Sequence, residues 1–320
     1  MNRQIDLFDG HCDTILMRYL QGGDFWKNDG HVDLERAGKY RRYAQFFAIW
    51  GQPEDFPGRD LREMTMRRIF QEEYGLFQRE MEDHADKICH CRTGAEAEAA
   101  FAEGKRAAFL SVEGAELLDC SLERLEEAHA LGVRAVNLTW NHVNALSGTN
   151  LEEPDRGLTS QGRAFVEKMG RLGMLVDVSH LSDPGFWDVA ELVSGPFFAS
   201  HSNARPVFSH TRNLTDEQFT AIIDHDGVAG LNLYAQFLGE QADLDTVVAH
   251  LEHWLELGGA RSIALGGDLD GCSQLPEGFR GVQDWERLWE RLLQRNYSEA
   301  LLRTLFFENL MRVVSEVCTM

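Results

Sequence analysis

The chain is poor in basic residues for its size. Of its 320 residues, 31 are Lys or Arg and 52 are Asp or Glu, so the formal net charge is −21 with His neutral. Nucleic-acid binding requires a basic face that neutralises phosphates, and no cluster of Lys or Arg supplies one. The composition therefore argues against a nucleic-acid partner. It leaves room for a small anionic substrate, because a single well-placed Arg can bind an anion locally.

Long apolar segments are also absent. The longest runs, such as 46–50 and 107–110, are far shorter than the roughly 20 residues that a membrane-spanning helix needs. The N-terminus lacks the charged start, the apolar stretch and the small-residue cleavage site of a signal peptide. We therefore expect a cytoplasmic protein with no membrane partner.

Cysteine spacing indicates no disulfide framework. No Cys-x-x-Cys motif occurs, and reduced thiols are the expected state of all six cysteines: Cys12, Cys89, Cys91, Cys120, Cys272 and Cys318.

What the sequence does contain is a recurrent pattern of short apolar runs, each followed by a polar residue or glycine and most of them separated by helix-length sequence. The runs lie at 5–8, 45–50, 107–112, 134–139, 174–178, 196–200, 228–233 and 262–265. Such runs are typical of parallel strands buried on both faces, and eight of them favour closure into a barrel. We predict an α/β protein, a (β/α)8 TIM barrel with extra helices, as one domain over 1–320.

The extra helices are expected in two places. Two amphipathic stretches after the last run, at about 282–295 and 298–317, are predicted to cover the outside of the barrel. The stretch 61–86 is longer than a standard crossover and mostly helical in pattern. We interpret it as a lid or an interface, and its Met and Phe residues as a surface on which a homodimer could form.

Chemically active side chains follow the predicted strands. In a barrel of this kind the carboxyl ends of all strands meet at one rim, where active sites are built. One such residue on its own is often only a helix cap. Three histidines and three carboxylates at successive strand ends are much harder to explain as caps: His11, Asp13, Glu113, His180, His201 and Asp268.

This set of donors predicts a metal site. Imidazole and carboxylate together suit Zn²⁺, and Mn²⁺, Co²⁺ or Fe²⁺ accept the same donors. His11 and Asp13 are two residues apart, so their side chains point the same way and can hold one ion. His180 and His201 can hold a second ion, with Glu113 placed to bridge. Two metals about 3.5–4 Å apart would polarise a carbonyl and make hydroxide from a bridging water near neutral pH.

Segments along nearly the whole chain resemble the membrane dipeptidase (renal dipeptidase) family of zinc peptidases. Each is short, but their order is highly specific: Asp9-Gly-His-Cys-Asp13, Ser111-Val-Glu-Gly114, Gly132-Val-Arg-Ala-Val-Asn-Leu-Thr139, Gly157-Leu-Thr159, Val176-Asp-Val-Ser-His180, Ser200-His-Ser202, Arg212-Asn213 and Gly266-Gly-Asp-Leu-Asp-Gly271.

The resemblance implies a barrel with two zinc ions and assigns roles to individual positions. His11 and Asp13 would bind one zinc, His180 and His201 the other, and Glu113 would bridge them. The position of Asp268 is that of the residue that moves the proton. Arg212 would grip the terminal carboxylate of the substrate, a role that suits the rigid fork of a guanidinium. Asn232 and Tyr234 would lie near the substrate.

One position departs from the family pattern. The family commonly has a histidine directly after Leu-Thr on the fourth strand, where it helps to stabilise the oxyanion, and here that residue is Trp140. His142 lies two residues further on and can point to the same side, so we assign the oxyanion role to His142. The signal and lipid-anchor segments of animal members are not seen in this sequence, as in soluble bacterial-type enzymes.

The expected activity is the hydrolysis of dipeptides by a hydroxide that bridges two zinc ions. The family tolerates a D-amino acid at the C-terminal position, so L,D-dipeptides join L,L-dipeptides as candidate substrates.

Three other functions compete with this interpretation. Another metal-dependent amidohydrolase, such as a deaminase or lactonase, often opens with His-x-His and bridges its metals with a carboxylated Lys, whereas this chain has His-x-Asp and no Lys in 138–142. A barrel that only binds a ligand would not need every expected metal ligand and Asp268. A nicotinamide or phosphate binder is disfavoured, because no Gly-x-Gly-x-x-Gly follows a strand.

Overall fold

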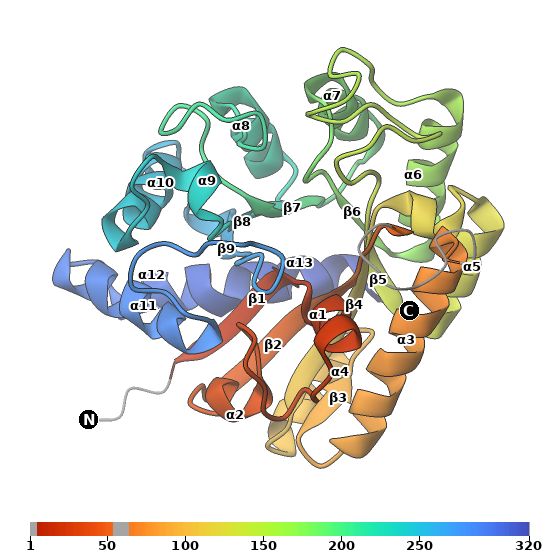
Figure 1. Cartoon of the computed structure of the whole chain (residues 1–320). Helices are drawn as coiled ribbons and strands as arrows, with labels where there is room; N and C mark the ends of the chain where they lie inside the picture. Colours follow the sequence, from red (N-terminus) through yellow and green to blue (C-terminus); the bar gives the residue numbers. More distant parts are fainter. Residues whose placement is uncertain (1–4, 54–63, 320) are drawn as a thin grey trace.

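The computed structural model describes residues 5–53 and 64–319, which form a closed barrel of eight parallel strands surrounded by helices (Figure 1). The barrel closes because β2 pairs with β4 on one side and with β1 on the other, while β1 also pairs with β9. The predicted fold is confirmed. Its strands are β1 (Asp6–Cys12), β2 (Arg42–Ile49), β4 (Arg106–Glu113), β5 (Val133–Asn137), β6 (Leu175–Asp177), β7 (Phe198–Ser202), β8 (Val228–Leu231) and β9 (Ile263–Leu265).

One further strand, β3 (Ile88–His90), lies outside the eight predicted runs. It pairs in parallel with the first three residues of β4, whereas β5 pairs with the last four. Strand β3 therefore extends the sheet beside the N-terminal end of β4 and is not one of the eight barrel strands. The strand has only three residues, and only Ile88 is fully buried. Its hydrophobic pattern is therefore too short to be recognised in the sequence.

Helices connect the strands and cover the barrel. Several begin where the sequence offers an N-cap side chain: Ser121, Thr159, Ser182 and Thr215 each accept a hydrogen bond from a backbone N–H in the first turn. The helices are α1 (Thr14–Gln21), α2 (Leu34–Ala37), α3 (Met66–Asp83), α4 (Gly94–Ala102), α5 (Leu122–Leu131), α6 (Ser160–Leu172), α7 (Asp183–Leu192), α8 (Asp216–Asp224), α9 (Ala235–Leu238), α10 (Leu244–Glu256), α11 (Trp285–Gln294), α12 (Glu299–Arg303) and α13 (Asn309–Val317).

No helix in the described ranges is long and apolar enough to cross a membrane.

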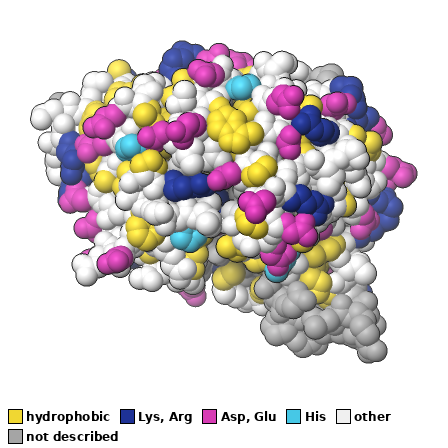
Figure 2. All heavy atoms as spheres, turned by 90° about the horizontal axis from the view of Figure 1, so that it is seen from above, with side chains coloured by type: hydrophobic (Ala, Val, Ile, Leu, Met, Phe, Trp, Pro, Cys, Tyr) yellow, Lys and Arg dark blue, Asp and Glu magenta, His cyan; other side chains and the backbone are white. Residues whose placement is uncertain are grey.

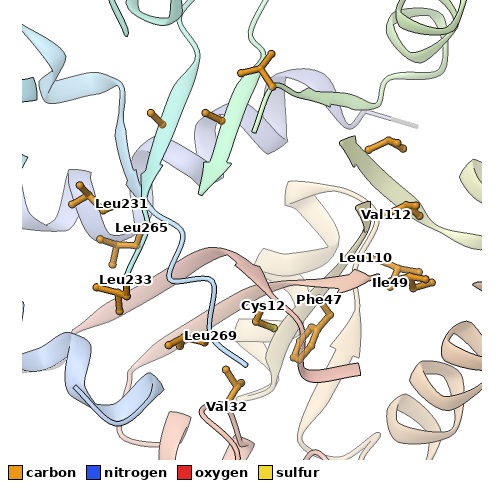
Figure 3. Close-up of a cluster of buried hydrophobic side chains, with 14 of the residues drawn as sticks. Cys12, Val32, Phe47, Ile49, Leu110, Val112, Leu231, Leu233, Leu265 and Leu269 are labelled. Atoms are coloured by element: carbon orange, nitrogen blue, oxygen red, sulfur yellow. The ribbon is translucent and has the colours of Figure 1, made fainter. Parts of the chain in front are cut away.

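The strands sort their side chains into two separate cores by simple alternation. In β4, Ala107 and Phe109 belong to the core inside the barrel, while Leu110 and Val112 belong to the core between strands and helices. Figure 3 shows this outer core, with side chains from β2, β4, β8 and β9 pointing away from the barrel axis.

The inner core is built from stacked aromatic rings. Phe8, Phe46 and Phe109 lie with ring centroids 5.3–5.7 Å apart, and Phe198 lies 5.9 Å from Phe46. All four are essentially inaccessible to solvent. Each buried ring contributes roughly 1.5–3 kcal/mol through removal from water. This layer fills the half of the barrel nearer the N-terminal ends of the strands, called the lower half below. The upper end, where the strands end, is left to polar side chains.

The C-terminal helices differ from the prediction that both would cover the outside. Helix α11 does so, but α13 packs with the residues inside the barrel, and a Cβ built on Gly10 would lie 3.6 Å from Leu310. Asn309 donates hydrogen bonds to the carbonyls of Ala260 and Ile263, where β9 begins. Helix α13 therefore closes the N-terminal mouth of the barrel, and it lies behind the strands in Figure 1.

The segment 61–86 is helical as predicted, with α3 covering most of it, while residues 61–63 lie outside the described residues. Helix α3 packs on the barrel: Phe77 lies 6.1 Å from Phe47 of β2 and 6.5 Å from Phe25. Its apolar residues thus belong to this chain's own core. The use of this segment as a lid or a dimer surface stays a prediction.

Asp6 at the start of the barrel gives a test of how a buried charge supports the fold. Arg41 and Arg42 both donate to its carboxylate, and their charge holds the pKa of Asp6 below its ordinary value despite burial, which acts in the opposite direction. We expect Asp6→Asn to lower the free energy of unfolding by about 1–3 kcal/mol at pH 7. Because the folded-state pKa is depressed, the difference should be complete above the unfolded pKa of about 4 and should vanish as the pH falls through the folded value. Urea denaturation between pH 3 and 7 checks this, with the exposed Glu217→Gln as control. A difference that is independent of pH would contradict it.

Candidate metal centre

Alternation along the strands brings polar side chains into the upper mouth of the barrel. Glu113 has the same parity as Ala107 and Phe109 and is the last residue of β4, so its carboxylate points inward just above the aromatic layer. Asp177 follows Leu175 of β6 in the same way, and Asp268 continues the parity of Ala264 beyond the end of β9. The rule that strand ends converge is therefore sufficient to bring distant parts of the chain together.

Glu113 lies between two groups of side chains. Its Oε1 is 3.0 Å from Nε2 of His180 and 3.4 Å from Nε2 of His201. Its Oε2 is 3.4 Å from Nε2 of His11, and the same nitrogen is 3.4 Å from Oδ2 of Asp13. The structure thus brings together all five residues predicted as metal ligands, with one carboxylate oxygen of Glu113 turned toward each pair.

The cluster is withdrawn from solvent. None of the five residues is more than 7% exposed. The imidazoles are crowded, with 3.0 Å between Nε2 of His180 and Nε2 of His201 and 4.0 Å between the ring centroids of His11 and His201. Three protonated rings could not share this space without large repulsion.

The pKa values of the histidines are separated accordingly. Burial alone would lower the pKa of His11, but the carboxylates of Glu113 and Asp13 outweigh it and raise that pKa well above the ordinary value. Burial, with the positive charges of Arg212 and His11, holds the pKa of His180 and of His201 well below the ordinary value. His180 and His201 are therefore neutral at pH 7, the form in which imidazole binds metal.

Side-chain hydrogen bonds orient two of the three rings. Nδ1 of His180 lies 2.9 Å from Oδ1 of Asn141, and Nδ1 of His201 lies 2.6 Å from Oγ of Ser200. In both rings Nε2 is left to face Glu113. Partners of this kind commonly fix the tautomer and orientation of metal-binding histidines. Asn141 and Ser200 were not among the site residues predicted from the sequence, although each directly precedes a residue that was.

The residues present fit a divalent transition metal. Within the described ranges, both ring nitrogens of His11 and Oδ1 of Asp13 are buried without a hydrogen-bond partner, a costly arrangement for groups that can act as ligands. Two sets of donor atoms, each within 4.8 Å of one another, meet at His11: one with Glu113 and His201, the other with Asp13 and Asp268. The nitrogen and carboxylate donors match the preferences of Zn²⁺ and its neighbours.

Three of the eight non-glycine residues with a positive φ in the described ranges lie at or beside this site. His180, Asp268 and Asp270 have φ values of 72°, 54° and 69°, in the left-handed region that residues with a Cβ rarely adopt. Such conformations persist only where the surroundings enforce them, and they cluster at functional sites. The conformation of Asp270 is held in this way, because its carboxylate accepts hydrogen bonds from Oγ1 of Thr14 and from the backbone N–H of His31.

Asp268 lies beside the cluster, and Asn232 Nδ2 donates to its Oδ2 at 3.1 Å. Burial and the nearby charge of Asp13 raise the pKa of Asp268 to about 6, against the opposing effects of His11 and Arg212. A carboxyl group with such a pKa can take up and release a proton near neutral pH. Burial likewise raises the pKa of Glu113 to about 7.

Arg212 is buried next to the cluster. One of its terminal nitrogens donates to the carbonyl of His201 at 3.1 Å, and its guanidinium lies 5.4 Å from the ring centre of Phe237. Its Nε is buried and has no hydrogen-bond partner among the described residues. The guanidinium thus keeps a donor free close to the imidazoles.

Asn232 and Tyr234 differ in their distance from the chemistry. Asn232 is fully buried and contacts Asp268, and its Oδ1 also accepts a hydrogen bond from the backbone N–H of Tyr234. Tyr234 is half-buried at the start of α9, where its hydroxyl lies 3.3 Å from Oγ of Ser273.

His142 is not brought into the cluster. Its side chain is 57% exposed, and its Nδ1 pairs with Oε1 of Glu152 at 2.9 Å. The ring of Trp140 lies near both histidines, 5.5 Å from His142 and 6.3 Å from His180 between ring centroids. It is Asn141, between Trp140 and His142 in sequence, whose side chain reaches the site.

Among the described residues, the face in Figure 2, which shows the molecule of Figure 1 from above, carries no large patch of one charge. Figure 2 shows basic and acidic side chains scattered among hydrophobic ones over this face. Nothing on it resembles the basic face that nucleic acid requires.

Comparison with known proteins places this geometry in a family. The family model of the membrane dipeptidases, described as peptidase family M19, matches residues 1–320. A curated protein of Klebsiella pneumoniae, described as an uncharacterised protein in the pqqA 5′ region, is 32% identical over 245 residues, which are 73% of this chain and 90% of that protein.

Solved structures of metallo peptidases have the same fold as this chain. A metallo peptidase from Rhodobacter sphaeroides, crystallised with a phosphinate mimic of the dipeptide L-Ala-D-Ala, superposes with a TM-score of 0.87 at 29% identity, covering 98% of this chain and 100% of the other. The dipeptidase AC, a metallo peptidase, gives 0.86 at 29% identity, with 99% and 100% covered. The chain belongs to the membrane dipeptidase family, peptidase family M19.

Proposed function

We propose that this chain is a dipeptidase that works with two zinc ions and a hydroxide held between them. The observation that carries the proposal is the position of Glu113, whose two oxygens face separate groups of nitrogen and carboxylate donors. A carboxylate placed between two sets of ligands suits a two-metal site. Family membership supports a peptidase, and the donor set supports zinc, with Mn²⁺, Co²⁺ and Fe²⁺ suiting the same ligands.

The ligands divide into two groups in this proposal. His11 and Asp13 would hold one ion, His180 and His201 would hold the other, and Glu113 would contribute one oxygen to each. Bound there, the two ions would polarise the scissile carbonyl and lower the pKa of a shared water toward neutrality. The low pKa values of His180 and His201 support their role, since neither ring has to lose a proton to bind.

Asp268 moves the proton. Its carboxylate adjoins the proposed ligands His11 and Asp13, and Asn232 holds Oδ2 in place. It accepts a proton from the attacking water and returns it to the amine of the leaving amino acid. A carboxyl group whose pKa is raised to about 6 is suited to both steps.

Arg212 recognises the end of the substrate. Its buried guanidinium has an unpartnered Nε close to the proposed ligands, and the fork of a guanidinium matches a carboxylate. Binding of the terminal carboxylate there limits the substrate to two residues, because a longer chain would place its carboxylate too far from the scissile bond. The mimic of L-Ala-D-Ala bound to the Rhodobacter sphaeroides relative supports L,D-dipeptides as candidate substrates beside L,L-dipeptides. Asn232 and Tyr234 complete the substrate side of the site.

Oxyanion stabilisation by His142 stays a prediction. It would require the imidazole to leave Oε1 of Glu152 and turn toward the cluster.

Metal content and substrate range test the proposal together. We expect purified protein saturated with Zn²⁺ to hold two ions per chain and to hydrolyse free dipeptides, but neither tripeptides nor dipeptides with an amidated C-terminus. Glu113→Gln should lose at least one ion and nearly all activity, because a single residue serves both positions. Elemental analysis and a dipeptide screen provide the measurements, with the exposed Glu123→Gln as a matched control. Protein that holds fewer than two ions, or that cleaves amidated dipeptides equally well, would contradict the proposal.

Asp268→Asn separates proton transfer from metal binding. We expect kcat to fall by about 10²- to 10⁴-fold, the range typical of a lost general acid–base, with two ions still bound. Steady-state kinetics and elemental analysis of the same sample check this. Full activity would remove Asp268 from the reaction, and loss of an ion would make it a ligand instead.

A further inference from the structure

His180 is held from outside the barrel by the segment 141–150, which follows β5. Three contacts join them. Oδ1 of Asn141 lies 2.9 Å from Nδ1 of the His180 ring, the backbone N–H of Asn150 donates to the carbonyl of His180 at 3.0 Å, and Thr149 forms an antiparallel bridge with Leu181. Side chain and backbone of His180 are therefore fixed by the same segment.

The backbone of His180 needs such support. Its φ of 72° lies in the left-handed region, which is unfavourable for a residue with a Cβ. The hydrogen bond from Asn150 to the carbonyl of His180, with the bridge between Thr149 and the next residue, Leu181, accounts for how this conformation is kept. They fix the Cα–Cβ direction but leave rotation about the side-chain bonds to be settled by what the ring contacts.

Asn141 makes the polar contact that settles it. An amide oxygen can only accept a hydrogen bond, so Nδ1 of His180 carries the proton and Nε2 keeps its lone pair. That lone pair faces the site, where Oε1 of Glu113 is 3.0 Å away. A ring flipped by 180° about Cβ–Cγ would place Cδ2 beside Asn141 and Cε1 where Nε2 now faces Glu113, so both contacts would be lost.

His201 and His11 provide a comparison inside the same site. Ser200 holds Nδ1 of His201 at 2.6 Å, in the manner of Asn141 with His180, whereas Nδ1 of His11 has no hydrogen-bond partner among the described residues. Within the proposed pair His180 and His201, each ring thus has its own polar support. The carbonyl of Asn141 accepts a hydrogen bond from Oγ1 of Thr149, so Asn141 is itself anchored to the segment that grips the backbone of His180.

We propose that Asn141 is a positioning residue, which fixes the tautomer and the rotation of His180 so that Nε2 is presented to the second metal ion. The proposal rests on the two-metal function for its consequence, but the effect on the ring exists without metal. Loss of a partner of this kind commonly weakens metal affinity by about 10- to 100-fold.

The test compares three variants in the full-length chain. Asn141→Ala removes the acceptor, Asn141→Asp keeps an acceptor oxygen in place, and Leu151→Ala changes an exposed side chain of the neighbouring loop as control. Zn²⁺ affinity is measured by competition with a chromophoric chelator. We expect one of the two dissociation constants to rise about 10- to 100-fold in Asn141→Ala, and both to stay within about threefold of wild type in the other two variants.

A second measurement is independent of metal. In the metal-free protein labelled with ¹⁵N-histidine, the His180 shifts should report a protonated Nδ1 in wild type and a mixture of tautomers in Asn141→Ala. Unchanged shifts, or Asn141→Asp as impaired as Asn141→Ala, would overturn the role of Asn141. If the wild-type protein binds no metal while Asn141→Ala still shows the mixture of tautomers, the two-metal function is overturned and the positioning of the ring by Asn141 stands.

Discussion

The structure depends on a buried carboxylate that is shared by two groups of ligands. Glu113 turns one oxygen to His11 and the other to His180 and His201, with Asp13 and Asp268 close by. A cluster of carboxylates and imidazoles inside a barrel costs folding free energy, since each ionised group is removed from water and like charges face each other. Divalent cations would offset this cost by replacing lost hydration with direct bonds. The site thus makes physical sense as a metal centre and poor sense as a structural core.

The rest of the barrel keeps this cluster in place. Aromatic rings fill the lower half of the interior and α13 closes the bottom, so polar residues at the upper mouth rest on a rigid base. Asp9 ties the mouth together by accepting hydrogen bonds from the backbone N–H of Gly267 and from Nε1 of Trp285. Binding residues built on strand ends and fixed by such neighbours are positioned more accurately than residues on free loops.

Much of the site could be predicted from the sequence because two simple rules act together. Apolar runs mark buried strands, and the ends of parallel strands meet at one rim, so the amino-acid order alone is enough to group Glu113, His180 and His201. The order of the short motifs along the chain then identified the family. These signals are strong because every barrel strand must satisfy them.

Less could be predicted where neither rule applies. Beyond the end of β5 the chain no longer alternates, so His142 could not be placed by counting, and Asn141 reaches the site instead. The amphipathic pattern of α13 shows that one face is buried but does not show against what, and the helix covers the barrel mouth instead of its side. Strand β3 is too short to carry a pattern of its own.

Anomalous diffraction from crystals of the zinc-loaded protein tests the central claim most directly, with data on both sides of the zinc absorption edge. The account predicts two peaks, one beside His11 and Asp13 and one beside His180 and His201, with Glu113 between them. A single peak, or peaks that do not contact Glu113, would contradict it.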